Sequence, residues 1–275
     1  MIKNSFKDHI IFLFLLCISC SFASAGDWQT IEKGFEIAWF ASGDSSEEDS
    51  MITVVRVNPK QYELIFCSVS DSGDSENLTT RQWCEQEGLL LAINGGMFDT
   101  DYKTHIGFMK SGEIINSKRR NKYKSALAIN SIEAEQQAFK IYDLDSDSLD
   151  SIISKYDYVM QNLRLIKRDL ENRWSPKKTR KWTEAALAED SAGNALFIIC
   201  RKSMTMYDFN ERILSLPLGI VAAQHLEGGV QTQMYIRFGE FKLGLSGGFE
   251  SRMMNGTGGD FLFKLPHVIG VRKVE

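Results

Sequence analysis

The chain has 275 residues, of which 43% are hydrophobic and 25% charged, and its formal net charge is −4. This composition is typical of a globular protein with a sizeable core, and the length suits one large domain or two small ones. The slightly acidic balance argues against a general nucleic-acid binder, and we expect no nucleic-acid partner.

The first residues have the pattern of an export signal. Two lysines precede an apolar run from Ile10 to Cys17, and Ala23-Ser24-Ala25 has the small side chains of a cleavage site. The run is too short to span a bilayer, and no later apolar run is long enough to do so. We therefore predict a signal peptide over residues 1–25 and a periplasmic or secreted mature protein. A lipoprotein anchored at Cys20 is the alternative.

Three cysteines follow the predicted cleavage point. Cys67 and Cys84 can pair in an oxidising compartment or remain free, because no spacing rule decides between the two. Cys200 ends an apolar run and is predicted to be a buried thiol. No Cys or His spacing resembles a metal site, so we expect neither a metal nor a cofactor.

The first half of the chain is predicted to be rich in strands. Residues 51–57 and 62–69 flank Asn58-Pro59-Lys60-Gln61 and are expected to pair as a hairpin. Thr79 and Gln82 form a capping box, which predicts a short helix over 80–87. The other predicted strands are 35–40, 89–93 and a hairpin within 105–116. The basic segment 117–124 is predicted to be a solvated loop.

The second half continues this pattern. Residues 156–166 indicate either a strand pair or one bulged strand. Two hairpins are predicted, one of 185–189 with 195–200 and a second across Gly239-Glu240. The remaining predicted strands are 125–130, 138–142, 261–265 and 268–271. Short helices are predicted at 149–155 and from Asp208 to Pro217. Strands outnumber helices, and the helices are short. The predicted fold class is α+β, a single domain over residues 26–275 around a mixed, largely antiparallel β-sheet.

Two strand ends share one pattern. The apolar run 89–93 leads into Asn94-Gly95-Gly96, and the run 220–226 leads into Glu227-Gly228-Gly229. Paired glycines at the end of a buried strand permit positive φ and let backbone amides approach a ligand closely. We expect the two junctions to face one shared pocket.

The same junctions carry a family resemblance. Ile93-Asn94-Gly95-Gly96-Met97-Phe98 resembles the Asn-Gly-Gly-Phe/Met-Phe motif of the phosphodiester glycosidase family, and Leu226-Glu227-Gly228-Gly229 resembles its Leu-Asp-Gly-Gly-Gly-Ser element. Gln161-Asn162-Leu163-Arg164 stands where the family has its middle motif. The resemblance extends from about Ile52 to the C-terminus. It implies a hydrolase that acts on a sugar phosphodiester or a related envelope glycan.

The chain departs from the family pattern at two places. Glu184-Ala185-Ala186-Leu187 stands where the family usually has Arg-Thr-Ala-Ile/Leu, and Val230-Gln231 follows Gly229 in place of Gly-Ser. Both changes remove groups expected near a phosphate or a sugar. They motivate an alternative function, a non-catalytic binding protein for anionic glycans that uses Arg164 and the basic loop 167–181.

Three side chains are candidates for catalysis. Glu227 is predicted to act as an acid, a base or an acceptor from a sugar hydroxyl, or alternatively to hold the amides of a tight turn. Asn94 is predicted to orient a hydroxyl or a phosphate oxygen, or alternatively to occupy a left-handed turn. Asp99 is a candidate second carboxylate, with an Asx-turn as the alternative.

The candidate substrate-binding residues are Gly95, Gly96, Asn162, Arg164, Gly228 and Gly229. Backbone amides at the glycine pairs can bind an anion without a charged side chain. Arg164 is a candidate phosphate clamp, with a structural ion pair to Glu227 as the alternative. His225, within its strand, is predicted to be a packed side chain.

Overall fold

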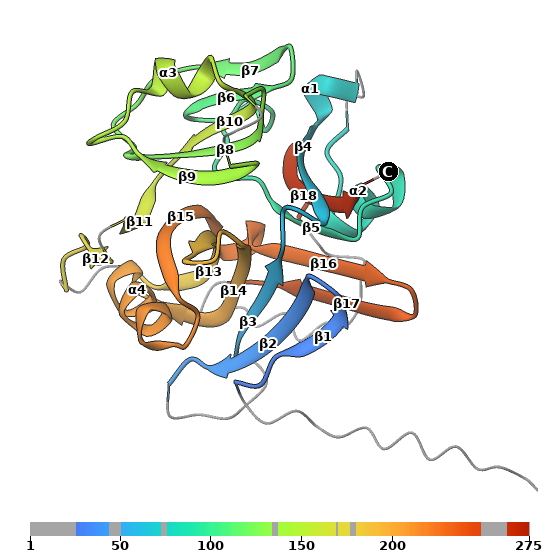
Figure 1. Cartoon of the computed structure of the whole chain (residues 1–275), viewed down its shortest axis with the longest axis vertical. Helices are drawn as coiled ribbons and strands as arrows, with labels where there is room; N and C mark the ends of the chain where they lie inside the picture. Colours follow the sequence, from blue (N-terminus) through green and yellow to red (C-terminus); the bar gives the residue numbers. More distant parts are fainter. Residues whose placement is uncertain are drawn as a thin grey trace, which may run out of the picture.

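The computed structural model describes residues 26–43, 51–72, 76–133, 137–168, 170–176, 180–248 and 263–274. Within them the chain forms three β-sheets with short helices on their outer faces (Figure 1). The predicted signal peptide, the alternative anchor Cys20 and the start of the run at 261–265 lie outside the described residues. No helix in the described ranges has the length and apolar character needed to cross a membrane.

The sheets are named I, II and III here, and their strands are given in spatial order. Sheet I contains β1 (Gln29–Glu32), β2 (Phe35–Ala41), β3 (Met51–Val57), β14 (Ala195–Met204), β13 (Trp182–Asp190), β15 (Ile220–Gly228), β11 (Arg164–Lys167) and β12 (Glu171–Asn172). Sheet II contains β7 (Ile114–Lys118), β6 (Phe108–Ser111), β10 (Tyr156–Asn162), β8 (Ser125–Ser131) and β9 (Phe139–Asp143). Sheet III contains β17 (Phe241–Ser246), β16 (Gln233–Phe238), β5 (Leu91–Asn94), β18 (His267–Lys273) and β4 (Tyr62–Ser68).

The helices are α1 (Val69–Ser72), α2 (Thr80–Gln86), α3 (Leu149–Ile153) and α4 (Met206–Ser215), and a 3-10 turn, η2, covers Gly229–Gln231. Thr79 caps α2 with the predicted capping box, in which the Thr79 and Gln82 side chains each accept a bond from the other residue's backbone amide. Thr205 caps α4 in a similar way, and its hydroxyl accepts from the Asp208 amide at 3.1 Å.

The core lies between the three sheets. One cluster of buried side chains draws on all three, for example Phe197 from sheet I, Met160 from sheet II and Ile93 from sheet III. Alternate residues of the same strands face outward and pack under a helix, α4 on sheet I, α3 on sheet II and α2 on sheet III. Strands buried on both faces need continuous apolar sequence, which explains runs such as 196–199.

The predicted fold class is confirmed, since the fold is α+β with short helices and largely antiparallel strands. Every ladder between the described strands is antiparallel, and the strands are divided among three sheets rather than gathered in one. The predicted hairpins β6–β7, β13–β14 and β16–β17 are confirmed.

The predicted hairpin of 51–57 with 62–69 is wrong. Both strands exist, but β3 pairs with β2 and β14 in sheet I, whereas β4 pairs with β18 in sheet III. The amides of Gln61 and Tyr62 donate to the Asn58 carbonyl, so the turn redirects the chain from one sheet to the next. The turn sequence marks a reversal and does not identify the partner strand.

The two alternatives for 156–166 are resolved into two strands in different sheets. β10 ends at Asn162 in sheet II, and β11 begins at Arg164 in sheet I, with Leu163 between them. The Leu163 carbonyl accepts from the His225 amide at 2.8 Å. This single-residue switch brings Asn162 next to the end of β15.

The two thiols that can pair in an oxidising compartment are free. Cys67 and Cys84 are both buried in the cluster under α2, beside Trp83 and Leu89, and Cys200 is buried under α4. Burial raises the pKa of the Cys84 thiol to about 12, which keeps it protonated and unreactive.

A thiol titration checks this result. Protein that begins at Gly26, unfolded without reductant, is expected to react with Ellman's reagent at all three of its cysteines. Reaction at Cys200 alone would show that Cys67 and Cys84 are joined.

Candidate functional site

The two glycine junctions meet, and the chain's connectivity explains why. β15 ends at Gly228, the short turn η2 follows, and β16 then pairs with β5, with Met234 opposite Ile93. The end of β15 is thereby brought to the end of β5. The Asn94 amide nitrogen donates to the Glu227 carbonyl at 3.3 Å, and the Asn94 oxygen accepts from the Gln233 amide at 3.2 Å.

The first junction has no room for side chains. Gly96 has φ +125°, and a Cβ there would lie 2.8 Å from the Asn162 amide oxygen and 2.9 Å from His105 Cε1. A Cβ on Gly95 would lie 2.7 Å from His267 Cδ2. Glycine is therefore required for close packing at both positions. Both polar atoms of the Asn162 side chain are buried without a hydrogen-bond partner among the described residues.

His105 and His267 are buried together under this junction, with ring centroids 5.4 Å apart. Burial lowers the pKa of His105 to about 4, and burial followed by the charge of His105 lowers that of His267 to about 3. Both rings are therefore neutral at pH 7. The Nε2 atom of His105 lies 2.9 Å from the Gln161 carbonyl, which anchors that ring to β10.

The second junction is packed as tightly. A Cβ on Gly228 would lie 2.4 Å from the Trp182 ring, and Gly229 has φ +71°. The Thr183 hydroxyl donates to the Gly229 carbonyl at 2.9 Å, and the Thr232 hydroxyl lies 3.2 Å from the Glu227 carbonyl. These contacts hold the backbone on both sides of the Glu227 side chain.

The Glu227 carboxyl group is half-buried between the junctions. Its Oε1 accepts from the Gly228 amide at 3.1 Å. Burial raises the pKa of Glu227, the charge of His225 and the Gly228 amide lower it, and the nearby Glu184 raises it again. The pKa of Tyr123 is raised by burial and then by the charge of Glu227. The Tyr123 hydroxyl lies 3.9 Å from Met97 Sδ. Tyr123 therefore faces both junctions.

A chain of buried polar groups lies behind Glu227. The Trp182 indole donates to Glu184 Oε2 at 2.7 Å, and His225 Nδ1 contacts Glu184 Oε1. The Glu184 and His225 side chains are both almost completely buried. The nearby charges of Glu184 and Glu227 raise the pKa of His225 against the lowering effect of burial, which is the largest single influence on it.

Two sequence candidates face other partners. The Arg164 guanidinium contacts Asp143 and bonds Asp145 at 2.7 Å, so it forms an ion pair with these two aspartates and not with Glu227, the partner in the alternative to a phosphate clamp. Asp99 contacts Arg119 and accepts from the Thr100 amide at 2.7 Å, which is a local turn interaction. Arg164 and Asp99 thus lie outside the group of predicted site residues that the structure brings together. That group is Asn94, Gly95, Gly96, Asn162, Glu227, Gly228 and Gly229.

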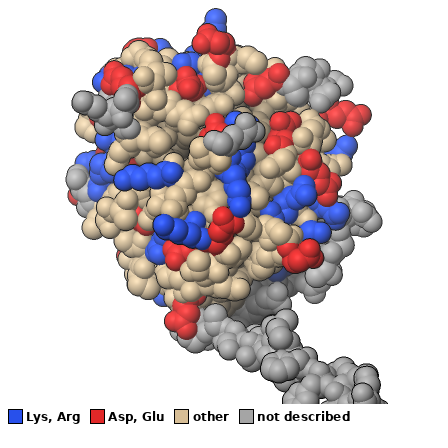
Figure 2. Space-filling model, turned by 45° about the vertical axis from the view of Figure 1, so that its right-hand side comes forward, with Lys and Arg blue, Asp and Glu red and all other residues tan. Residues whose placement is uncertain are grey.

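The basic segment 117–124 carries ion pairs of its own. Arg119 pairs with Asp99, Arg120 with Asp150, and Lys124 with Asp145 at 3.2 Å. On the face shown in Figure 2, Lys and Arg side chains lie among Asp and Glu rather than in a separate basic patch. In the loop 167–181, residues 169 and 177–179 lie outside the described residues.

Three aromatic side chains stand beside the first junction. Phe98 stacks on Phe263 with ring centroids 6.0 Å apart, and Tyr102 lies 6.1 Å from Phe263 and is 54% exposed. Phe98 also meets His267 edge to face. An exposed aromatic face next to polar groups is a common surface for the apolar face of a sugar ring.

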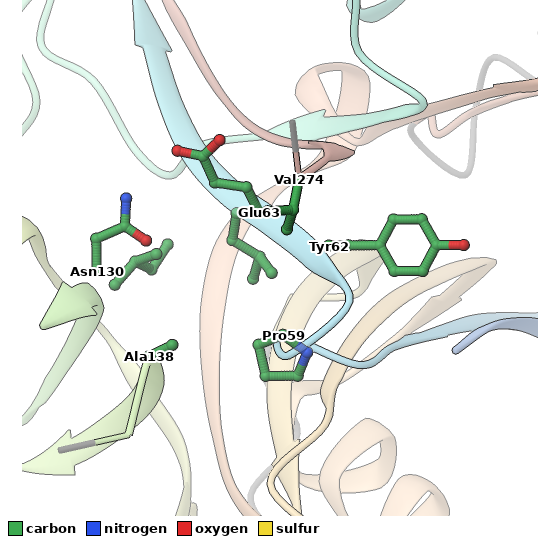
Figure 3. A pocket seen from close by; sticks show the side chains of 8 residues that line it. Pro59, Tyr62, Glu63, Asn130, Ala138 and Val274 are labelled. Carbon is green, nitrogen blue, oxygen red and sulfur yellow. The ribbon is translucent and has the colours of Figure 1, made fainter. Parts of the chain in front are cut away.

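A separate cavity of about 230 Å³ lies between β4 and the β8–β9 edge. Figure 3 shows Glu63 and Asn130 at this cavity, with the Tyr62 ring pointing away from them. Glu63 is paired with Arg272 at 2.7 Å, and none of the junction residues lines the cavity.

In the described part of the chain, no three His, Cys, Asp or Glu side chains gather as a metal site.

The family comparison agrees with this geometry. The sequence profile of the family described as phosphodiester glycosidase matches residues 87–272, well over half of the chain, and this span contains both glycine junctions. The chain belongs to the phosphodiester glycosidase family. No curated protein sequence matches it significantly.

Solved structures share the fold of this phosphodiester glycosidase family member. The catalytic domain of zebrafish N-acetylglucosamine-1-phosphodiester alpha-N-acetylglucosaminidase, auto-inhibited by its pro-peptide, superposes with a TM-score of 0.60 at 11% identity, covering 91% of this chain and 87% of that one. A hypothetical protein from Synechocystis gives 0.56 at 13% identity, with coverages of 90% and 64%. An exported protein of Burkholderia pseudomallei gives 0.50 at 9%, with coverages of 86% and 74%. At these identities the likeness establishes the fold alone.

Sequence reasoning missed several residues of the site. His225 was expected to be only packed, yet its ring pairs with Glu184 and lies in the field of Glu227. The available signal was the two-residue spacing of His225 and Glu227, which puts two side chains on one face wherever a strand is regular. Trp182 and Tyr123 gave no such signal, because their place at the site depends on pairings between strands far apart in the sequence.

Proposed function

We propose that the protein is a hydrolase that cleaves a glycosyl phosphodiester or a related envelope glycan at the junction of β5 and β15. The observation that carries this proposal is the bond from Asn94 to the Glu227 backbone, which joins an amide side chain and a half-buried carboxyl group at one place. Family membership supports the reaction class.

The site supplies what this reaction needs. Cleavage of a glycosidic bond passes through an oxocarbenium-like state and usually needs a carboxyl group that gives or takes a proton. A carboxyl group whose pKa is raised by burial keeps its proton to higher pH and suits the role of acid. We assign this role to Glu227.

The substrate's other parts have partners near Glu227. Asn162 has two polar side-chain atoms beside Gly96 that lack a hydrogen-bond partner among the described residues. Phe98 and Tyr102 offer a surface for a sugar ring. Asn94 holds the two junctions together and thus positions Glu227, whereas Arg164 and Asp99 are left out of the proposed site because carboxylate and turn contacts occupy them.

Hydrolysis of a chromogenic sugar phosphodiester tests the proposal. The wild-type protein is expected to release the chromophore, and Glu227→Gln is expected to lower kcat at least about 100-fold, because the acid is lost while shape is kept. Glu240→Gln is the matched control, since Glu240 is an exposed glutamate in the β16–β17 turn; its rate should equal that of the wild type.

Equal rates in Glu227→Gln and the wild type would remove Glu227 from the mechanism. Binding of an anionic glycan without turnover by the wild-type protein would favour the non-catalytic alternative.

Because the first 25 residues have the pattern of a signal peptide, we further propose that the reaction takes place in the periplasm or outside the cell, and fractionation of expressing cells tests this.

A further inference from the structure

The strand that carries Glu227 is irregular where it meets Glu184. Along β13 the partners of Ala186 and Glu184 on β15 are His225 and Gly228, so β15 has one extra residue in this interval. Such a β-bulge bends the strand and re-aims side chains, and bulges are common beside active sites. The bulge falls on Leu226 and Glu227.

Next to the bulge, both oxygens of the buried Glu184 side chain have a polar contact. One of its oxygens accepts from the Trp182 indole and the other contacts His225 Nδ1. These two contacts fix the orientation of the Glu184 side chain between the Trp182 and His225 rings.

The charged and titratable neighbours of this pair come from three directions. Glu227 lies on the same strand, Tyr123 interacts with Glu227 from the loop before β8, and Cys200 faces Glu184 from β14 beside Lys202. Burial raises the pKa of Cys200 to about 12, so the thiol is neutral, as is Tyr123 with its raised pKa. The electrostatic balance is therefore set by Glu184, His225 and Glu227.

We propose that His225 is a positioning residue that keeps the two neighbouring carboxyl groups in different roles, Glu184 as a fixed carboxylate and Glu227 as the group that exchanges a proton. The inference rests on the proposed function for its catalytic meaning. A protonated His225 ring beside these two carboxyl groups would compensate the charge of Glu184, which raises the pKa of Glu227. Two carboxyl groups with different environments are a recurring arrangement for acid and base roles.

The first experiment needs no substrate. His105, His225 and His267 are the histidines of a protein that begins at Gly26, so their ring nitrogen signals can be followed separately by NMR during a pH titration. His225 is expected to be protonated at pH 7 with both ring nitrogens bearing hydrogen, while His105 and His267 stay neutral. In Glu184→Gln the His225 midpoint is expected to fall by about one pH unit or more.

The second experiment measures the pH profile of kcat/KM for the chromogenic phosphodiester. His225→Gln keeps a hydrogen-bond donor toward Glu184 but removes the charge, so the limb assigned to Glu227 should move about one unit or more to higher pH. The double variant Glu184→Gln with His225→Gln removes both charges, so its limb should return toward the wild-type position. If Glu184 and His225 have only a structural role, both variants should lose activity, but the limb assigned to Glu227 should stay at the same pH in each.

The outcomes separate the two ideas. A neutral His225 at pH 7 in the wild type, or a titration unchanged by Glu184→Gln, overturns the inference even if hydrolysis is observed. A charged His225 that responds to Glu184→Gln in a protein without hydrolytic activity keeps the charge arrangement and overturns the proposed function. If His225→Gln unfolds, the NMR titration of the folded Glu184→Gln protein still decides.

Discussion

Lowering the pH from neutral to about 4 is expected to reduce the free energy of unfolding by on the order of 5 kcal/mol, because two neutral histidines are buried beneath the first glycine junction. In the unfolded chain each ring takes up a proton near its ordinary pKa of 6.5, whereas in the folded protein His105 does so at about 4 and His267 at about 3. The unfolded state therefore binds more protons throughout this window. The stabilisation is fully present above pH 6.5 and is lost as the pH falls.

Urea unfolding at several pH values measures this effect through the shift in midpoint. His225 and Glu227 act with the opposite sign, because a raised pKa stabilises the folded protein at low pH and ceases to do so as the pH rises through it. His267→Gln is the matched variant, since it removes one titrating ring and should flatten the dependence. An unfolding midpoint that stays constant between pH 7 and pH 4.5 would contradict the burial of neutral rings.

Gly96→Ala is expected to destabilise the protein by about 3 kcal/mol or more, a large part of the roughly 5–15 kcal/mol by which an ordinary domain is stable. The added Cβ would lie 2.8 Å from Asn162 and 2.9 Å from His105, and the residue would have to keep φ +125°. Neither neighbour can withdraw easily, because both are fully buried.

Gly112→Ala measures the cost of a positive φ in the left-handed helical region, without close contacts to the added Cβ. Gly112 also has a positive φ, +56°, in the β6–β7 turn, but a Cβ there meets nothing within 4 Å. This variant should lose only about 1 kcal/mol, the cost of a left-handed conformation for a residue with a side chain. Equal losses in the two variants, measured by thermal or urea unfolding, would show that the contact with Asn162 and His105 has no energetic weight.

Local pattern predicted the elements of this fold well and their partners less well. The capping box of α2, the turn at Gly239-Glu240 and the apolar run of β5 are each specified by a few neighbouring residues. The partner of β3 is not, because β3 and β4 are apolar strands that suit any buried sheet. Pairing is decided by side-chain packing across the whole core.

The candidate site divides in the same way. Asn94, Glu227 and the glycines were recognisable because the tight junctions require glycine and the motif is contiguous. Arg164 looked available as a phosphate clamp, yet β11 starts in a new sheet after Leu163 and its side chain meets Asp143 and Asp145. The alternation of apolar and polar residues does not show that the chain passes from one sheet to another after Leu163. The direction of the Arg164 side chain could therefore not be predicted from the sequence.

The position of β18 has a consequence for biosynthesis. Strand β18, residues 267–273, lies between β5 and β4 in the middle of sheet III rather than at its edge. β4 and β5 are synthesised early, but the strand that lies between them is the last of the five strands of sheet III to be synthesised. Because contacts distant in sequence form late, sheet III can be completed only after residues 267–273 have been synthesised. A chain that ends before residue 267 should therefore lack a complete sheet III.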